Sequence, residues 1–379
     1  MAISAIEEAG ARLTIDLKAL AANYRLLAER AGPAECAAVV KADAYGLGAD
    51  RIVPALAKAG ARTFFVALAN EARKLRAVSG NSTVYVLNGL TPGAAAAYAE
   101  IGARPVLCTS DEVAEWAAFC RAANKRLPAA LHVDSGMNRL GLSLPEVRAL
   151  AQEKNGALEE FELALVMSHF VSSEIADDPL NARQIADFAA LHALFAGVPA
   201  SLANSSGIFL RQKPHFDLVR PGYALYGGNP LPGLPNPMAP VVRLEARVMQ
   251  LREIAAGATV GYNAQWTALR PSRLATLALG YADGFPRPAG GLDKKPGGSA
   301  VIAGRPCPIV GRVSMDLVVA DITGLEETAV RRGDWACVLG PEIGVDALGE
   351  AGGTIGYDIL TRLGRRFARL YVDGASRAA

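Results

Sequence analysis

The sequence predicts an α/β protein in which a (β/α)8 barrel is followed by a mainly β C-terminal domain. Three observations predict it. Eight short apolar runs alternate with longer helical patterns in the first part of the chain. A Pro- and Gly-rich segment, residues 229–240, then interrupts the alternation, and strand-like runs dominate beyond it. We therefore expect a barrel over residues 12–238 and a β domain over residues 239–379, to which residues 1–11 also belong.

Each of the eight predicted barrel strands is short and apolar, as strands buried on both faces are. They cover residues 36–41, 63–68, 83–88, 105–109, 128–134, 163–169, 200–205 and 215–220. Helical patterns between them cover residues 49–59, 70–78, 111–126, 144–153 and 181–195. A count of eight, without an early G-x-G-x-x-G, favours a closed barrel over an open doubly wound sheet.

In the second domain, strand-like runs are punctuated by Gly and Pro. They cover residues 241–252, 274–280, 299–302, 307–313, 317–322 and 335–339. A last helix is expected over residues 356–369.

Composition excludes several classes of function. With 39 basic and 37 acidic residues the net charge is +2, which gives no electrostatic basis for binding nucleic acid or a membrane surface. No apolar run is long enough to span a bilayer, and the first residues lack a signal-peptide pattern. The five cysteines and four histidines show no metal-binding spacing, so we expect no metal site. Scattered, reduced thiols favour a cytoplasmic protein.

Polar residues end most of the predicted barrel strands, and in such barrels the chemistry lies at those ends. They are Lys41, Asn88, Asp134, His169, Asn204 with Ser205, and Arg220. A lysine in an apolar barrel mouth loses its proton more easily, and only a neutral amine attacks a carbonyl carbon. Taken alone, Lys41 reads more simply as a strand-end lysine whose amine reaches solvent.

Nine motifs, in order along nearly the whole chain, resemble those of the alanine racemases, the pyridoxal-phosphate enzymes of fold type III. The first is V-K-A-D-A-Y-G-L-G at residues 40–48. The others cover residues 132–141, 168–170, 204–206, 220–227, 260–264, 280–284, 311–316 and 355–357. Any one motif is weak evidence, whereas the collinear set is specific.

The resemblance implies that Lys41 binds pyridoxal 5'-phosphate covalently and that Lys41 and Tyr262 are two bases on opposite faces of the substrate. Together they would interconvert L-alanine and D-alanine. Because the ordinary pKa of a phenol is about 10, Tyr262 needs tuning downward, for which His169 and Arg220 are candidates. In the family this tyrosine comes from the other subunit, so the resemblance implies a homodimer with shared active sites.

The resemblance also implies the remaining site residues. Those expected to bind the cofactor, besides Lys41, are Tyr45, His169, Ser205, Arg220, Gly222, Tyr223 and Tyr357. Arg139 and the backbone N–H of Met315 would hold the substrate carboxylate, and Tyr281 would narrow the entrance. Arg220 would face the pyridine nitrogen, where a guanidinium can only donate and so keeps that nitrogen unprotonated.

One residue departs from the family pattern. Many relatives carry a carbamylated lysine where this chain has His132, so Arg139 must be oriented in another way. Alternatives to alanine racemisation are a racemase of broader or serine specificity, a decarboxylase, and a non-catalytic carrier of the cofactor. A decarboxylase would have a carboxylate in place of Arg220, and the carrier lacks a large second domain. The expected role is D-alanine supply for peptidoglycan or alanine catabolism.

Overall fold

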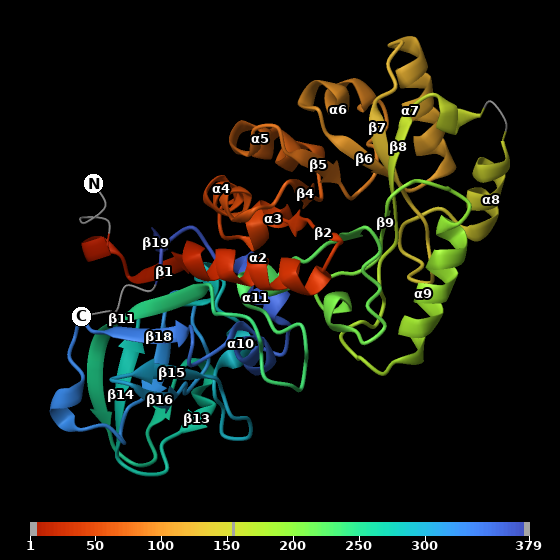
Figure 1. Cartoon of the computed structure of the whole chain (residues 1–379). Helices are drawn as coiled ribbons and strands as arrows, with labels where there is room; N and C mark the ends of the chain where they lie inside the picture. The colour runs from red at the N-terminus through yellow and green to blue at the C-terminus, as the bar shows by residue number, and fades with distance from the viewer. Residues whose placement is uncertain (1–5, 154–155, 375–379) are drawn as a thin grey trace.

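The computed structural model describes residues 6–153 and 156–374, which form two parts (Figure 1). The first is a barrel of parallel strands with helices outside it, and the second is a mainly antiparallel β domain. The predicted fold class is confirmed. Residues 1–5 and 375–379, at the two ends of the predicted β domain, lie outside the described residues.

The barrel strands follow the order of the chain and are parallel. One sheet contains β3 (Ala38–Val39), β4 (Thr63–Val66), β5 (Thr83–Val86), β6 (Arg104–Leu107), β7 (Pro128–His132), β8 (Glu162–Met167) and β9 (Ala200–Ser201). In β4, the residues Thr-Phe-Phe-Val are all buried. Because helices cover one face and the barrel interior the other, these strands read as continuous apolar runs.

The ring is closed by β10 (Leu218–Val219), the eighth strand position. It pairs in parallel with β2 (Glu35–Cys36), which together with β3 corresponds to the first predicted strand. On its other side, Arg220 N donates to Ala203 O at 2.8 Å, just beyond β9. The carboxyl ends of the first and last strands therefore lie side by side.

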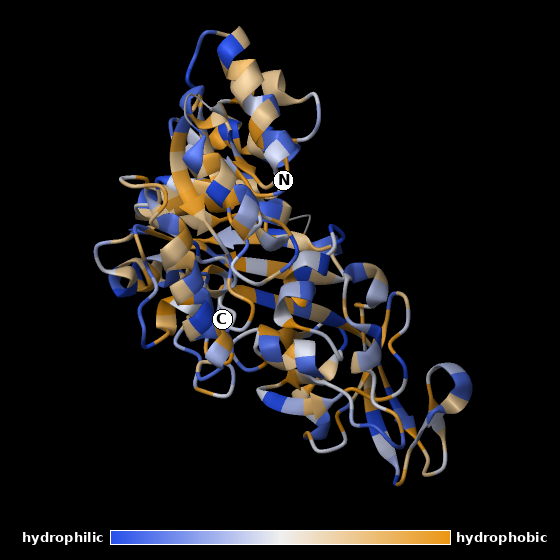
Figure 2. Cartoon of the chain, turned by 90° about the vertical axis from the view of Figure 1, so that its right-hand side faces the viewer, coloured by the Kyte–Doolittle hydropathy of each residue, from blue (hydrophilic) through white to orange (hydrophobic). Residues whose placement is uncertain are grey.

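Helices cover the outside of the barrel. They are α2 (Leu17–Ala31), α4 (Ala49–Ala59), α5 (Ala69–Ser79), α6 (Ala95–Ile101), α7 (Ser110–Ala122), α8 (Leu144–Gln152) and α9 (Pro179–His192). Each helix buries an apolar face against the barrel: α4, for example, buries Ile52, Val53 and Leu56. In Figure 2 the barrel strands are mostly orange, whereas the helices around them carry blue segments.

The β domain is built around β11 (Val242–Ile254), which pairs antiparallel with β1 (Ala11–Asp16), β14 (Ser272–Leu277) and β18 (Trp335–Leu339). β1 also pairs in parallel with β19 (Ala368–Val372). The other strands of this sheet are β15 (Ser299–Ile302), β16 (Arg305–Pro308) and β17 (Val318–Asp321). A strand near the start of the chain thus shares a sheet with one near its end.

The predicted helix over residues 356–369 is wrong in its second half. The helix there, α11 (Gly356–Arg362), stops before Leu363. Residues 363–367 form no helix, and residues 368–372 form β19, of which only the first two lay in the predicted helix. The alternating sequence Ala-Arg-Leu-Tyr-Val pairs with β1, and at residues 368–369 this long-range pairing overrides the expected helix.

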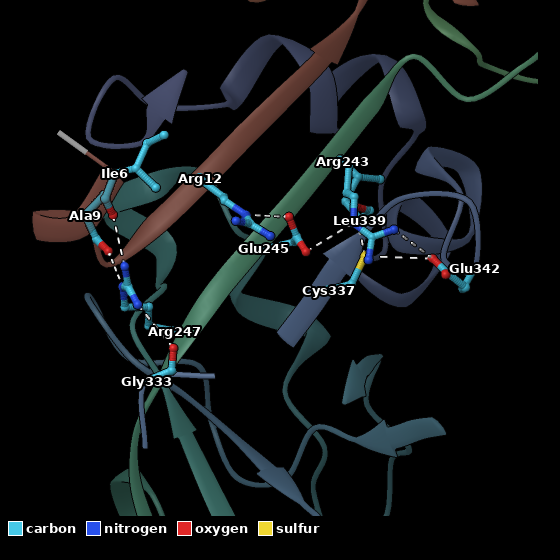
Figure 3. A network of polar contacts seen from close by, with 10 residues as sticks. All are labelled: Ile6, Ala9, Arg12, Arg243, Glu245, Arg247, Gly333, Cys337, Leu339 and Glu342. Carbon is cyan, nitrogen blue, oxygen red and sulfur yellow. Dashed lines mark hydrogen bonds and ion pairs between the residues drawn. The ribbon is translucent and has the colours of Figure 1, made fainter. Parts of the chain in front are cut away.

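Ion pairs fasten β1 to the centre of the β domain (Figure 3). Arg12 lies opposite Glu245 in the register of β1 and β11, and its Nε is 2.7 Å from the glutamate Oε2. Arg243 approaches the other carboxylate oxygen at 3.2 Å. Arg247 donates to the carbonyl of Ala9 at 3.1 Å. The segment leading into the barrel is therefore held on the β sheet.

Two short helices join the β domain to the barrel mouth. They are α10 (Val345–Ala351) and α11, and α11 packs against the loop that follows β3. A Cβ on Gly46 of that loop would lie 2.6 Å from Leu360 O, so only glycine permits this approach. One side of the barrel mouth is thus covered by the β domain of the same chain.

Within residues 6–153 and 156–374, no helix has the length and apolar character needed to cross a bilayer. The same residues contain no group of three His, Cys, Asp or Glu side chains placed to hold a metal ion.

Candidate active site

A left-handed turn follows Lys41 at the end of the first barrel strand. Ala42, Asp43, Ala44 and Tyr45 have φ angles of 54–55°. Each such residue costs about 1–2 kcal/mol when it is not glycine, so surrounding contacts must hold the turn. Gly46 N donates to Ala42 O at 2.7 Å and closes it. The turn brings the side chains of Lys41 and Tyr45 to the same cavity.

The cavity at the barrel mouth has a volume of about 410 Å³. Its walls contain every residue that the resemblance assigns to cofactor binding, namely Lys41, Tyr45, His169, Ser205, Arg220, Gly222, Tyr223 and Tyr357. Val39, Ala42, Leu87, Asn204, Asp358 and Thr361 complete the lining. Of the polar residues predicted at strand ends, Asn88 and Asp134 do not line this cavity.

Backbone comes close to the cavity at Gly222. A Cβ there would lie 2.3 Å from Tyr45 Oη and 3.3 Å from Val39 Cβ. The hydroxyl of Ser205 accepts hydrogen bonds from the N–H groups of Gly222 and Ala224, at 3.1 and 3.2 Å. The hydroxyls of Ser205 and Tyr45 therefore lie beside the backbone of residues 222–224 in this wall, and such a grouping of polar groups suits a phosphate.

Arg220 is buried, with 4% of its surface exposed, at the end of β10. Its guanidinium donates to Ser168 O at 2.5 Å and to the hydroxyl of Ser201, and it lies 3.5 Å from His169 Nδ1. Among the described residues no carboxylate forms an ion pair with it. A buried cation without a carboxylate partner is costly unless a bound group compensates it.

The electrostatic surroundings favour neutral forms of two groups that line the cavity. Burial, together with the charges of Arg220, Arg139 and Lys41, lowers the pKa of His169 to about 3. Burial also lowers the pKa of Lys41, as does Arg139, whereas Glu71 raises it. His169 is therefore neutral at pH 7, and Lys41 gives up its proton more readily than an ordinary lysine.

Tyr357 reaches the cavity from α11 of the β domain. Its ring stacks on that of Tyr223, with ring centres 3.9 Å apart. The Tyr357 hydroxyl donates to Glu174 at 3.3 Å, and that of Tyr223 donates to Asp346 at 2.6 Å. The barrel and the β domain of one chain thus build this wall together.

Three residues predicted to act at the site lie on the β domain outside this cavity. Tyr262 in η4 (Tyr262–Ala264), Tyr281 in η5 (Tyr281–Asp283) and Met315 have 65%, 42% and 53% of their surfaces exposed. Tyr281 and Met315 belong to adjoining segments, since Tyr281 N donates to Ser314 O at 3.1 Å. A single chain therefore brings together the residues expected to bind the cofactor and leaves these three exposed on the β domain.

Arg139 is exposed and does not line the cavity, although its charge lowers the pKa of both Lys41 and His169. The turn before it is capped by Asp134, whose carboxylate accepts from the N–H groups of Gly136 and Asn138 at 2.8 and 2.9 Å. Asp134 thus shapes the turn that carries Arg139.

His132 occupies the position of the relatives' modified lysine and is buried. Its Nδ1 lies 3.8 Å from Cys108 Sγ. Burial lowers its pKa to about 4, and Arg220 contributes in the same direction. A neutral imidazole therefore stands where a negatively charged carbamate would stand in those relatives.

Three carboxylates that support the site were not predicted. Glu174 and Asp346 accept from the two stacked tyrosines. Glu71 accepts from the N–H of Ala42, directly after Lys41, at 2.6 Å. Their neighbouring sequences carry no chemical motif. For Glu71, a helix-start glutamate at the third position of α5 was the available signal, and it indicates capping alone.

A lysine with a lowered pKa beside hydroxyl and N–H groups, at the mouth of a (β/α)8 barrel, is the arrangement expected of a cofactor-dependent barrel enzyme. Two family descriptions match the chain: "Alanine racemase, N-terminal domain" over residues 15–230 and "Alanine racemase, C-terminal domain" over residues 241–371. The chain belongs to the alanine racemase family.

Individual relatives agree with the family match. An alanine racemase of Methylobacterium sp. (strain 4-46) is 58% identical over 364 residues, which is 96% of this chain and 98% of the relative. A second, of Methylobacterium nodulans, is 55% identical over the full length of both chains. The crystal structure of alanine racemase from Bartonella henselae, with covalently bound pyridoxal phosphate, is 42% identical with a TM-score of 0.90, covering 96% of this chain and 100% of that one.

Proposed function

We propose that this chain interconverts L-alanine and D-alanine with pyridoxal 5'-phosphate as cofactor, and that Lys41 and Tyr262 are its two bases. The observation that carries the proposal is the cavity itself. It gathers the eight residues expected to hold the cofactor, although they come from the two ends of the barrel sequence and from the β domain.

The residues of the cavity fit this cofactor. Ser205, Tyr45, Tyr357 and the backbone N–H groups at Gly222 and Tyr223 would hold the phosphate, since all five residues line the cavity. The buried charge of Arg220 and the nearby charges of Lys41 and Arg139 call for an anion. When bound, pyridoxal phosphate supplies the electron sink that stabilises negative charge at the substrate Cα.

Lys41 would bind the cofactor and, once released by the substrate, hold or deliver a proton on one face of the substrate Cα. Burial and Arg139 lower its pKa, so its amine becomes neutral more readily than an exposed lysine. The left-handed turn and the closing bond at Gly46 fix the backbone from which it extends. The second base must then stand on the opposite face.

Tyr262 would be that second base, supplied by another copy of the chain. It lies on the β domain with 65% of its surface exposed, as a residue that completes a partner's site would. Met315, whose backbone N–H would hold the substrate carboxylate with Arg139, and Tyr281, which would narrow the entrance, are exposed on the same domain. We therefore infer a homodimer in which each site uses both chains.

Arg220 would favour racemisation over side reactions. Its guanidinium lies at the cavity wall, is held by Ser168 O and Ser201, and can only donate hydrogen bonds. Beside the ring nitrogen of a bound cofactor, such a donor would leave that nitrogen unprotonated, so the electron sink that the cofactor supplies would be weaker. A weaker sink would favour racemisation over reactions that need a longer-lived negative charge at Cα.

The reaction runs in both directions, so it would supply D-alanine for peptidoglycan or feed alanine catabolism. The five cysteines are all free and buried, which suits the reducing cytoplasm.

The test is complementation between two defective chains. Lys41→Ala and Tyr262→Phe proteins, each of low activity alone, are unfolded together, refolded as a mixture and assayed. If each site takes Lys41 from one chain and Tyr262 from the other, about half the dimers are mixed and each contains one intact site, giving about a quarter of wild-type activity.

Two different affinity tags allow the mixed dimer to be purified and assayed by itself. Lys41→Ala chains carrying both tags form the matched control and should stay inactive. A purified mixed dimer without recovered racemisation of L-alanine would contradict shared sites, and a wild-type protein that leaves L-alanine optically unchanged would contradict the activity itself.

A further inference from the structure

Glu71, at the start of α5, contacts two backbone segments near Lys41: the residue after Lys41 and the residues that follow β4. One carboxylate oxygen accepts from Ala42 N at 2.6 Å. The other accepts from Ala67 N at 2.8 Å and Leu68 N at 3.1 Å, directly after β4. A single side chain therefore ties the residue after Lys41 to the end of the neighbouring strand.

The Ala42 N–H belongs to the peptide unit that it shares with Lys41. A bond to this group fixes the orientation of that peptide plane and hence the direction in which the Lys41 backbone leaves the barrel. It is also the first N–H of the left-handed turn, whose four residues are alanine, aspartate, alanine and tyrosine rather than glycine. Such a turn persists only where the surroundings hold it.

Asp43 supports the far end of the same turn. Its carboxylate accepts from Ala49 N at 2.9 Å, and Gly48 N donates to Asp43 O at 2.9 Å. These bonds tie the turn to the start of α4. Among the contacts described for the turn, Glu71 is the only charged side chain that joins the Lys41 end of the turn to another barrel strand. Hydrogen bonds to a charged group are stronger than those between neutral groups.

Resting on the proposed function, we propose that Glu71 is a positioning residue for Lys41. One of its oxygens orients the Lys41–Ala42 peptide, and the other anchors that peptide to the end of β4. Glu71 does not line the cavity and acts through Lys41.

The negative charge of Glu71 also acts on the Lys41 amine, and the direction of its effect on the pKa is defined. The charge of Glu71 raises the pKa of Lys41 against the lowering by burial and Arg139. Loss of that charge therefore moves the pKa of Lys41 further down. A shorter side chain that keeps the negative charge would instead disturb the orientation of the Lys41–Ala42 peptide and leave the pKa of Lys41 nearly unchanged.

The chain offers a matched control in Glu112. It follows β6 as Glu71 follows β4, and its Oε2 accepts from Cys108 N at 2.6 Å. Its helix α7 follows β6, which is the third strand along from β3, the strand that Lys41 follows. Glu112→Gln thus removes the charge from the same kind of backbone contact without touching the lysine turn.

The experiment measures Lys41 without substrate. The full-length protein, freed of cofactor by dialysis against hydroxylamine, is labelled with trace acetic anhydride across a pH series, and the modification of Lys41 is followed by peptide mass spectrometry. Its midpoint should fall by about half a pH unit or more in Glu71→Gln. The dissociation constant for added pyridoxal phosphate should rise about tenfold, as loss of one charge-assisted bond predicts.

Glu71→Asp separates the effect of peptide orientation from the effect of charge, and it remains informative if Glu71→Gln does not fold. It should keep the labelling midpoint near that of the wild type and still weaken cofactor binding. Glu112→Gln should lower the melting temperature and leave both readouts unchanged. The proposal is overturned if the Glu71 variants match the wild type in midpoint and cofactor binding, or if Glu112→Gln changes them equally.

These readouts do not depend on racemisation. A protein without racemase activity whose Lys41 still responds to Glu71 would refute the proposed function and leave the role of Glu71 standing.

Discussion

Replacing Gly222 with alanine should weaken cofactor binding through one steric contact. The new Cβ would lie 2.3 Å from Tyr45 Oη. An ordinary contact needs about 3.4 Å, so the atoms must separate by about 1 Å. The Tyr45 ring cannot swing freely, because it is buried and packs on Tyr226 with ring centres 4.7 Å apart. The strain falls on the wall expected to hold the phosphate.

Overpacking of this kind costs about 1–3 kcal/mol, so the dissociation constant for pyridoxal phosphate should rise about 5- to 150-fold. Titration of cofactor-free protein, followed by visible absorbance, measures it. Gly324→Ala is the control, since a Cβ there meets no atom within 4 Å. Unchanged cofactor affinity in Gly222→Ala would refute the close-approach argument, and an equal loss in Gly324→Ala would show that the effect is not local.

Two further predictions concern proton transfer and pH. Tyr262→Phe should slow removal of the Cα proton from L-alanine far more than from D-alanine, measured as exchange of that proton for deuterium; equal slowing would contradict two separate bases. The pKa of His169 is lowered to about 3, so below about pH 6.5 the unfolded chain binds a proton that the folded chain does not. As the pH falls from about 6.5 to about 3, this group should therefore lower the free energy of unfolding by about 1.4 kcal/mol per pH unit. In His169→Asn, the free energy of unfolding measured with urea should depend less steeply on pH.

Much of the site was predictable because parallel strands in a barrel end at one rim. That rule alone selected Lys41, His169, Asn204, Ser205 and Arg220, and all five line the cavity. It also selected Asn88 and Asp134, which do not, since a strand-end position fixes the rim but not the direction of the side chain.

The left-handed turn was not predictable from its own residues. Alanine and tyrosine avoid positive φ, and nothing in Ala-Asp-Ala-Tyr indicates four such residues in succession. The conformation depends on partners distant in sequence, such as Glu71 and Leu360. The same holds for β19, whose first two residues lay in the predicted helix but pair with β1.

The charges around the cavity connect its geometry to the reaction. Arg220 is buried against carbonyl and hydroxyl oxygens, with His169 and His132 both held neutral beside it. Two protonated imidazoles next to this guanidinium would repel it and oppose its burial. Neutral histidines instead leave Arg220 as the one fixed cation of that wall, so the ring nitrogen of a bound cofactor would meet a donor that cannot give up its proton. A carboxylate at position 220 would reverse that relation, because it would accept a hydrogen bond from a protonated ring nitrogen and so keep that nitrogen protonated. On the proposed function, the identity of this residue therefore bears on the reaction more directly than the shape of the barrel does.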